Sequence, residues 1–123
     1  MVSFSDLREV EKQLATLLFP KGLLDFFDVV SIEEKKGNYH FYLYEKNKVP
    51  QGYSKKDIES KGFYNLESIT DFPLRGKSCT LKLRRRKWLD KSTGAIIRRD
   101  WDVVAKGTRT TNEFATFLKG LNR

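Results

Sequence analysis

Apolar residues recur at helical spacing near both ends of the chain, whereas apolar and polar residues alternate through much of its middle. The first pattern predicts a helix over residues 5–19, which Pro20 ends. A second helix is expected over residues 111–121, where Thr110 and Glu113 have the spacing of a capping box. The apolar stripe of the first helix consists of Leu7, Val10, Leu14, Leu17 and Leu18.

The alternating stretches predict a succession of strands. Residues 29–35 and 39–45 are expected to pair around a turn at residues 36–38, since the glycine and asparagine there tolerate the positive φ of a tight hairpin. Both faces of residues 39–45 are partly apolar, which predicts a central strand covered on both sides. In the polar connection that follows, residues 54–60 are expected to form a short helix. Residues 63–72 are a further extended piece.

The last pair of extended stretches predicts a basic β-hairpin over residues 79–105, around a polar loop that ends in glycine. A pairing that buries the apolar base of this hairpin sets Arg86 opposite Arg98 and Arg85 opposite Arg99. Like charges in such positions are destabilising. A register shifted by two residues relieves one of these clashes, but it leaves the outer half of the hairpin basic on both faces.

These elements predict an α+β fold in a single domain, residues 1–123. An antiparallel sheet of four or five strands is expected to pack against the N- and C-terminal helices. Aromatic residues make up 13% of the chain, which excludes a disordered segment. One cysteine and one histidine leave no internal disulfide and no zinc site of the usual type, so no metal or cofactor is expected. No apolar run is long enough to span a membrane and the N-terminus is unlike a signal peptide, so a cytoplasmic location is expected.

The excess positive charge of the chain is concentrated in residues 75–99. They hold ten Lys/Arg and one acid, a local net charge of +9, whereas the whole chain carries +8. Such a field is typical of a surface that faces phosphate, with a solvated basic surface as the alternative. A two-stranded ribbon fits the major groove of DNA, where arginine contacts phosphate and guanine. The side chains expected to contact nucleic acid are Arg84, Arg85, Arg86, Lys87, Trp88, Arg98 and Arg99, with Lys82, Lys91 and Arg75 at the margin.

Two aromatic features have more than one interpretation. Trp88 can stack on a nucleic-acid base or on an arginine, or it can pack within the hairpin, and packing is favoured. The tyrosine-rich strand over residues 39–44 can present a base-stacking platform. Packing in the core is favoured there, because few basic residues lie within the strand.

No catalytic constellation is present in the sequence. Asp100 and Asp102 share one face of the expected strand, but ion pairs with Lys82 and Arg84 explain them more simply than a metal does. His40 has no cysteine or serine close to it, and glycine-rich phosphate loops, G-x-S-x-G and H-E-x-x-H are absent. The sequence therefore predicts a protein that is not an enzyme.

Several segments together resemble a known family: GFY, DFPLRGK, RRRKWLDK, RDWDVVAKGTR and EFATFLK, in this order. They are similar to the N-terminal region of bacterial insertion-sequence transposases of the type in which this region and the catalytic region are often separate reading frames. The resemblance extends from about residue 17 through nearly all of the chain.

The resemblance implies a role in mobile DNA. The catalytic region of such elements carries three acids on a ribonuclease-H-like fold, for which this chain has neither the length nor the pattern. We therefore expect a non-catalytic domain that binds transposon ends. The alternative is an assembly module that docks the catalytic transposase subunit, and RNA binding is a weaker third possibility. No oligomeric state is predicted.

Overall fold

The computed structural model describes residues 4–20 and 22–101. The chain divides into two compact units, one of which is Phe26–Asp100 while the other comprises the segments on either side of it. The helix expected over residues 111–121 lies outside the described residues, as does Asp102. The described part is mixed α+β, which confirms the fold class in its coarse form.

The segment before the sheet unit holds one α-helix and one short 3-10 turn. Helix α1 spans Phe4–Leu18, so the helix predicted from the apolar spacing is confirmed to within one residue at each end. The turn η1 spans Leu23–Asp25, and Leu23 is fully buried. The apolar stripe of α1 is exposed at Val10, Leu14 and Leu17.

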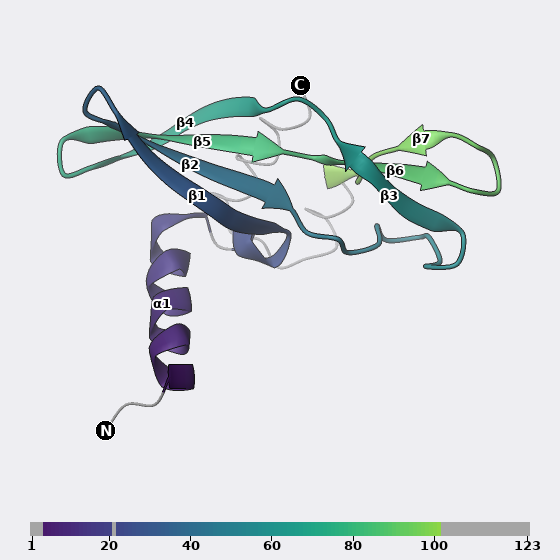
Figure 1. Cartoon of the computed structure of the whole chain (residues 1–123), viewed down its shortest axis with the longest axis horizontal. Coiled ribbons are helices and arrows are strands. Elements are labelled where there is room, and N and C mark those ends of the chain that lie inside the picture. The colour runs from purple at the N-terminus through teal and green to yellow at the C-terminus, as the bar shows by residue number, and fades with distance from the viewer. Residues whose placement is uncertain (1–3, 21, 102–123) are drawn as a thin grey trace. The chain divides into compact units, whose positions relative to one another are not determined.

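Four strands of the other unit form a sheet in the order β1-β2-β5-β4 (Figure 1). They are β1 (Phe27–Lys35), β2 (Asn38–Glu45), β4 (Glu67–Leu74) and β5 (Lys77–Arg84). Two-residue turns join β1 to β2 and β4 to β5. The first, Lys36-Gly37, has φ of 52° and 78°, and the second, Arg75-Gly76, has the same values. Positive φ at both positions is the signature of the type I′ hairpin turn. The turn predicted between the first two strands is confirmed in place, but the positive φ falls at Lys36 and Gly37, whereas Asn38 begins β2.

A second sheet has the order β3-β6-β7 and consists of β3 (Ile58–Phe63), β6 (Arg86–Asp90) and β7 (Ile96–Ile97). The prediction of one sheet of four or five antiparallel strands is therefore wrong in detail, because the described residues form seven strands in two sheets. The short helix expected over residues 54–60 is also wrong. That stretch enters β3, where Ile58 is buried and pairs with Asp90 across the ladder.

The basic hairpin is the largest departure from the sequence-based expectation. Strand β5 pairs with β4 in antiparallel fashion and with β2 in parallel fashion, with Leu43 beside Leu83. Residues 58–74 and 77–90 thus form one long bent ribbon. The ladder continues across the break between the two sheets, where the Tyr64 N–H donates to the Arg85 carbonyl at 2.8 Å.

The predicted return strand of that hairpin is much shorter than expected. Residues 102–105 of that strand lie outside the described residues. Among the described ones only β7 pairs back, placing Ile97 opposite Trp88, and Arg85 does not lie opposite Arg99. The loop between β6 and β7 is nevertheless as predicted. Gly94 has φ of 75° and its N–H donates to the Asp90 carbonyl at 2.7 Å.

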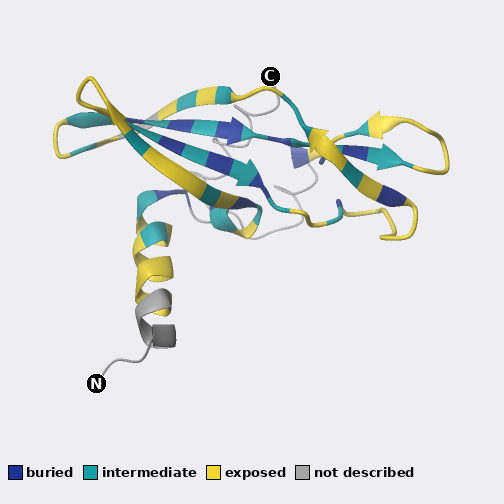
Figure 2. Ribbon diagram, viewed as in Figure 1, coloured by how far each residue is buried: buried dark blue, intermediate teal, exposed yellow. Residues whose placement is uncertain are grey.

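Buried and intermediate residues alternate along β2 and β5 (Figure 2), so the two faces of the four-stranded sheet differ in burial. One face carries Phe41 and Leu43 of β2 beside Leu81 and Leu83 of β5, all at most 3% exposed. Burying side chains of this size contributes about 1.5–3 kcal/mol each. The other face carries the alternate residues of β2 and β5, which are only half-buried. The prediction that residues 39–45 form a central strand is therefore confirmed, and its two faces are now distinguished. The half-buried residues of the second face are His40, Tyr42 and Tyr44 on β2 and Thr80, Lys82 and Arg84 on β5.

Candidate nucleic-acid interface

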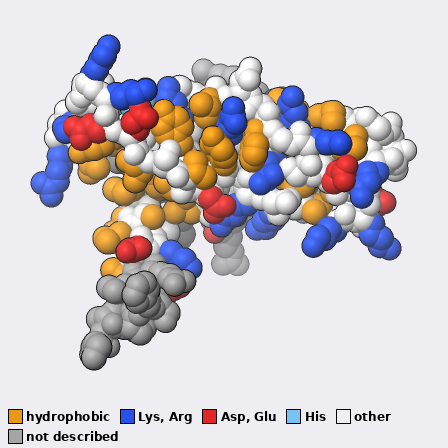
Figure 3. Space-filling model, viewed as in Figure 1, with side chains coloured by type: hydrophobic (Ala, Val, Ile, Leu, Met, Phe, Trp, Pro, Cys, Tyr) orange, Lys and Arg blue, Asp and Glu red, His pale blue; other side chains and the backbone are white. Residues whose placement is uncertain are grey.

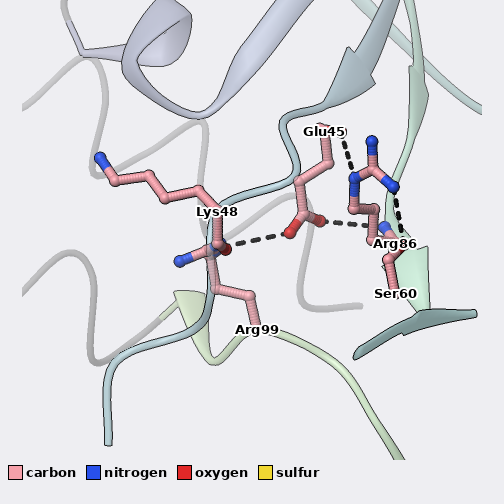
Figure 4. A network of polar contacts seen from close by, with 5 residues as sticks. All are labelled: Glu45, Lys48, Ser60, Arg86 and Arg99. Atoms are coloured by element: carbon pink, nitrogen blue, oxygen red, sulfur yellow. Dashed lines mark hydrogen bonds and ion pairs between the residues drawn. The ribbon is translucent and has the colours of Figure 1, made fainter. Parts of the chain in front are cut away.

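A buried carboxylate lies at the centre of the basic region. Alternation along β2 places Glu45 on the same face as Phe41 and Leu43, and it is 1% exposed. Its Oε1 accepts a hydrogen bond from the Arg86 backbone N–H at 3.0 Å, and its Oε2 accepts one from Arg99 Nε at 3.2 Å (Figure 4). A carboxylate in such a place requires partners of this kind, because an unpaired buried charge is strongly destabilising.

The arginines around Glu45 also bind other parts of the chain, as Figure 4 shows. Arg86 donates from Nε to the Glu45 carbonyl at 2.8 Å and from Nη1 to Ser60 Oγ at 2.6 Å. Arg99 donates from Nη2 to the carbonyl of Lys48. The network therefore joins β2 and the loop after it to β3, to β6 and to the segment that follows β7.

Burial raises the pKa of Glu45 above its ordinary value. The hydrogen bond from the Arg86 backbone and the charge and hydrogen bond of Arg99 act in the opposite direction, without cancelling the effect of burial. The Trp88 indole also favours the charged form, although its N–H makes no hydrogen bond of normal geometry.

A second arginine is buried with an acid of its own. Arg85 is 5% exposed and forms an ion pair with Glu67 of β4. Because Arg99 is equally buried against Glu45, the two arginines expected to face each other across a hairpin instead occupy separate internal ion pairs. The premise that they repel one another is therefore wrong, because each side chain has a carboxylate partner inside the fold.

Four side chains from four strands form a line of two rings flanked by two cations, which we call the aromatic–arginine row: Arg84, Tyr44, Phe63 and Arg86. The Arg84 guanidinium lies over the Tyr44 ring, 5.5 Å from its centroid. The Tyr44 and Phe63 rings are tilted against each other with centroids 5.2 Å apart. The Arg86 guanidinium lies 4.6 Å from the Phe63 centroid. All four side chains are half-buried, so the row runs across both sheets and keeps some contact with solvent.

More basic and aromatic side chains accompany the row. Tyr42 pairs with Lys82 in the parallel ladder beside it, and Lys82 Nζ donates to Ser68 Oγ at 2.8 Å. The Lys87 ammonium lies 5.2 Å from the centroid of the Tyr64 ring. In the space-filling view, hydrophobic and basic side chains interleave over the middle of the sheet (Figure 3).

The remaining side chains expected to contact nucleic acid occupy very different places. Lys91 and Arg98 are exposed around the β6–β7 loop. Arg75 is exposed in the β4–β5 turn, about 30 Å from Arg84 along the extended chain. Trp88 is 1% exposed, so its indole belongs to the core, as the favoured interpretation held.

The two bases expected to form ion pairs in the hairpin make other contacts in the structure. Lys82 binds Ser68 and Arg84 lies over Tyr44, while Asp100 is exposed. Within residues 4–20 and 22–101, no cluster of three His, Cys, Asp or Glu side chains is placed to hold a metal ion.

Sequence reasoning identified the bases but missed their acidic partners, Glu45 and Glu67. Glu45 carried a readable signal, because it continues the alternation that begins with Phe41 and Leu43 and so occupies a core position. An acid at such a position requires a buried cation. Glu67 carries no comparable signal, since it stands at the start of a strand among polar residues.

Comparison with known proteins gives no match: no family model fits the sequence, and neither a curated protein nor a solved structure is significantly similar to it. Among the helices of the described residues, none has the length and apolar character needed to cross a membrane.

Proposed function

We propose that this chain is a non-catalytic nucleic-acid-binding component of a transposition system, and that it contacts the phosphates of transposon DNA through basic residues of the 75–99 segment. The observation that carries the proposal is the local net charge of +9 in that segment. Phosphate contacts dominate the affinity of proteins for DNA, and a concentrated basic surface is the usual source of them.

The internal ion pairs refine which bases are available for phosphate. Three acids neutralise part of the excess charge. Glu34 pairs with Lys77, Glu67 with Arg85 and Glu45 with Arg99. Bases that are exposed or half-exposed remain on the same stretch of chain. They are the residues to which we assign phosphate contact: Lys82, Arg84, Lys87, Lys91 and Arg98, with Arg75 more distant.

The test is to neutralise two exposed bases that have no packing role. Lys91→Gln combined with Arg98→Gln should weaken binding to a DNA duplex about tenfold. The slope of log affinity against log salt should shrink by about two, since each phosphate contact contributes about 0.9. Anisotropy titrations at several salt concentrations measure both quantities.

A matched control removes the same charge elsewhere on the sheet unit. Lys35→Gln with Lys36→Gln alters exposed bases in the β1–β2 turn, at the opposite end of β2 from Glu45. We expect this control to change affinity by less than about threefold. Equal losses in the two double variants would show that only overall charge matters. Failure of the unaltered protein to bind duplexes from the ends of the insertion sequence would reject the proposed function.

The assembly alternative has one observation in its favour. Val10, Leu14 and Leu17 are exposed along one face of α1, at the i, i+4, i+7 spacing of a helix that binds a partner. Leu14→Glu should then abolish association with a separately encoded catalytic subunit while leaving duplex affinity unchanged. Retained association in that variant would remove the support for this alternative.

A further inference from the structure

Resting on the proposed function, we propose that the aromatic–arginine row binds the unpaired bases of single-stranded nucleic acid. The ligand chemistry is a flexible phosphodiester chain whose bases are free to stack. The row would act as the stacking surface, while Lys82 beside it contacts phosphate.

The first support is that these rings do not lie on the fully buried face of the sheet. The opposite face of the same sheet carries the side chains that are almost fully buried, including Phe41, Leu43 and Leu83. Tyr42 and Tyr44 alternate with them and are half-buried on the other face. A half-exposed run of aromatic rings on a sheet presents π-faces, on which any base can stack.

The second support is that the cations of the row are held in place. Arg84 lies over Tyr44 and Arg86 lies over Phe63, and Arg86 is further fixed by the Glu45 carbonyl and by Ser60. Arginine planes stack on bases as aromatic rings do. Because these side chains are already ordered, a ligand would bind without the full entropic cost of immobilising them.

The third support is the charge balance of this face. The acids of β1 that pair with it in the ladder are Asp28, opposite Tyr44, and Glu33, opposite His40. Asp28 forms an ion pair with Lys46 at 3.7 Å, and Glu33 forms one with Lys35 at 2.8 Å. Lys82 and Arg84 lie beside the tyrosines, so the face as a whole attracts a polyanion.

Spacing argues for a single strand rather than a duplex. Tyr42 and Tyr44 lie two residues apart on one strand, about 7 Å. Stacked bases in duplex DNA are 3.4 Å apart and are covered by their neighbours. Successive bases can meet both rings only if the strand is unpaired and extended.

The experiment compares three probes of about twelve nucleotides. They are a labelled oligothymidine, the same strand paired with oligodeoxyadenosine, and a labelled oligouridine. The variants are Tyr44→Leu, Tyr44→Phe and, as a matched control outside the row, Tyr53→Leu, which alters an exposed tyrosine of the 46–57 connection. Urea unfolding confirms that each variant is folded. If Tyr44→Leu does not fold, Tyr42→Leu replaces it as the test of the stacking surface.

We expect Tyr44→Leu to weaken oligothymidine binding by a factor of about five or more, because the stacking surface is lost. Tyr44→Phe should retain the affinity, Tyr53→Leu should match the unaltered protein, and duplex affinity should change by less than about twofold in every variant. Tighter binding of oligouridine with the same dependence on Tyr44 would assign the site to RNA; the reverse order would assign it to DNA. In both cases stacking of unpaired bases would be upheld.

The outcomes that overturn the inference differ from those that reject the proposed function. Unchanged oligothymidine affinity in both Tyr44→Leu and Tyr42→Leu, with duplex binding intact, would mean that the row only packs the two sheets together. Equal weakening of single-strand and duplex binding would also overturn it. Absence of binding to all three probes by the unaltered protein would reject the proposed function itself.

Discussion

Replacing Arg99 with methionine is the perturbation that most directly tests the buried network. The substitution keeps an apolar side chain of similar length and removes the charge. The substitution removes the 3.2 Å ion pair with Glu45 Oε2 and the hydrogen bond to the Lys48 carbonyl. It also removes the stacking of the guanidinium over Phe26, 5.2 Å from the ring centroid. Glu45 remains 99% buried in these surroundings and keeps the hydrogen bond from the Arg86 backbone at 3.0 Å.

Removing one partner of a buried ion pair typically costs 3–5 kcal/mol, because the other charge is left uncompensated. Because Glu45 keeps one hydrogen bond, we expect Arg99→Met to lose about 3 kcal/mol of folding stability, near the lower end of this range. Arg98→Met is the matched control, since Arg98 is the adjacent residue and is exposed. It should change the free energy of unfolding by no more than about 0.5 kcal/mol.

Urea unfolding followed by the fluorescence of two buried tryptophans, Trp88 and Trp101, measures both values. The loss in Arg99→Met should shrink as the pH falls. Burial already raises the pKa of Glu45, and removing Arg99, which lowers that pKa, raises it further. The carboxyl then takes up a proton in the folded variant and the uncompensated charge disappears.

A second substitution tests whether the uncompensated charge of Glu45 causes the loss of stability in Arg99→Met. Glu45→Gln in the Arg99→Met background removes the buried charge and should recover about 1–2 kcal/mol. Equal effects of Arg98→Met and Arg99→Met would refute the assignment of Arg99 to an internal pair. A loss below about 1 kcal/mol for Arg99→Met would do the same.

Two further predictions concern the carboxyl and the first hairpin turn. Burial raises the pKa of Glu45 in the folded state. The stability of the unaltered protein relative to Glu45→Gln should therefore be greatest below the ordinary pKa of 4.5. It should fall as the pH rises through the raised pKa of the folded state. Urea unfolding of both proteins across this range measures the difference, and an increase with pH would contradict the direction of the shift. Gly37→Ala should cost about 1 kcal/mol of folding stability, since a φ of 78° strains any side chain even though nothing lies within 4 Å of the new Cβ. Lys36→Asn should be neutral or stabilising, because asparagine tolerates the φ of 52° at that position. Thermal melts rank the two variants, and a stabilising Gly37→Ala would exclude the type I′ turn.

The elements that sequence reasoning placed correctly are those set by local chemistry. Apolar spacing identified α1, because a helix closes its hydrogen bonds within the segment. The turn at Gly37 and the loop ending at Gly94 were identified because each requires a positive φ at a residue that tolerates it. Strand β2 was also identified as central, since both of its faces carry apolar residues.

The elements placed wrongly depend on which strands meet. Strand β5 has apolar alternation that suits several partners, and the sequence offers residues 95–105 as the nearest later candidate. In the structure it pairs with β4 before it and with β2 in parallel. The parallel pairing joins segments about 40 residues apart, and no turn signal specifies it. The short helix expected over residues 54–60 failed for the same reason, because pairing with β6 overrides a weak local preference.

Tertiary structure alone decided which arginines are buried and which are exposed. The sequence by itself determined that bases are concentrated in residues 75–99, that acids there are scarce, and that rings stand at alternate positions of residues 39–44. It did not determine that Arg85 and Arg99 are buried while Arg98 is exposed. Arg99 meets Glu45 across 54 positions and Arg85 meets Glu67 across 18. Charge is a property of each residue, but the burial and pairing of that charge depend on strands brought together from distant parts of the chain.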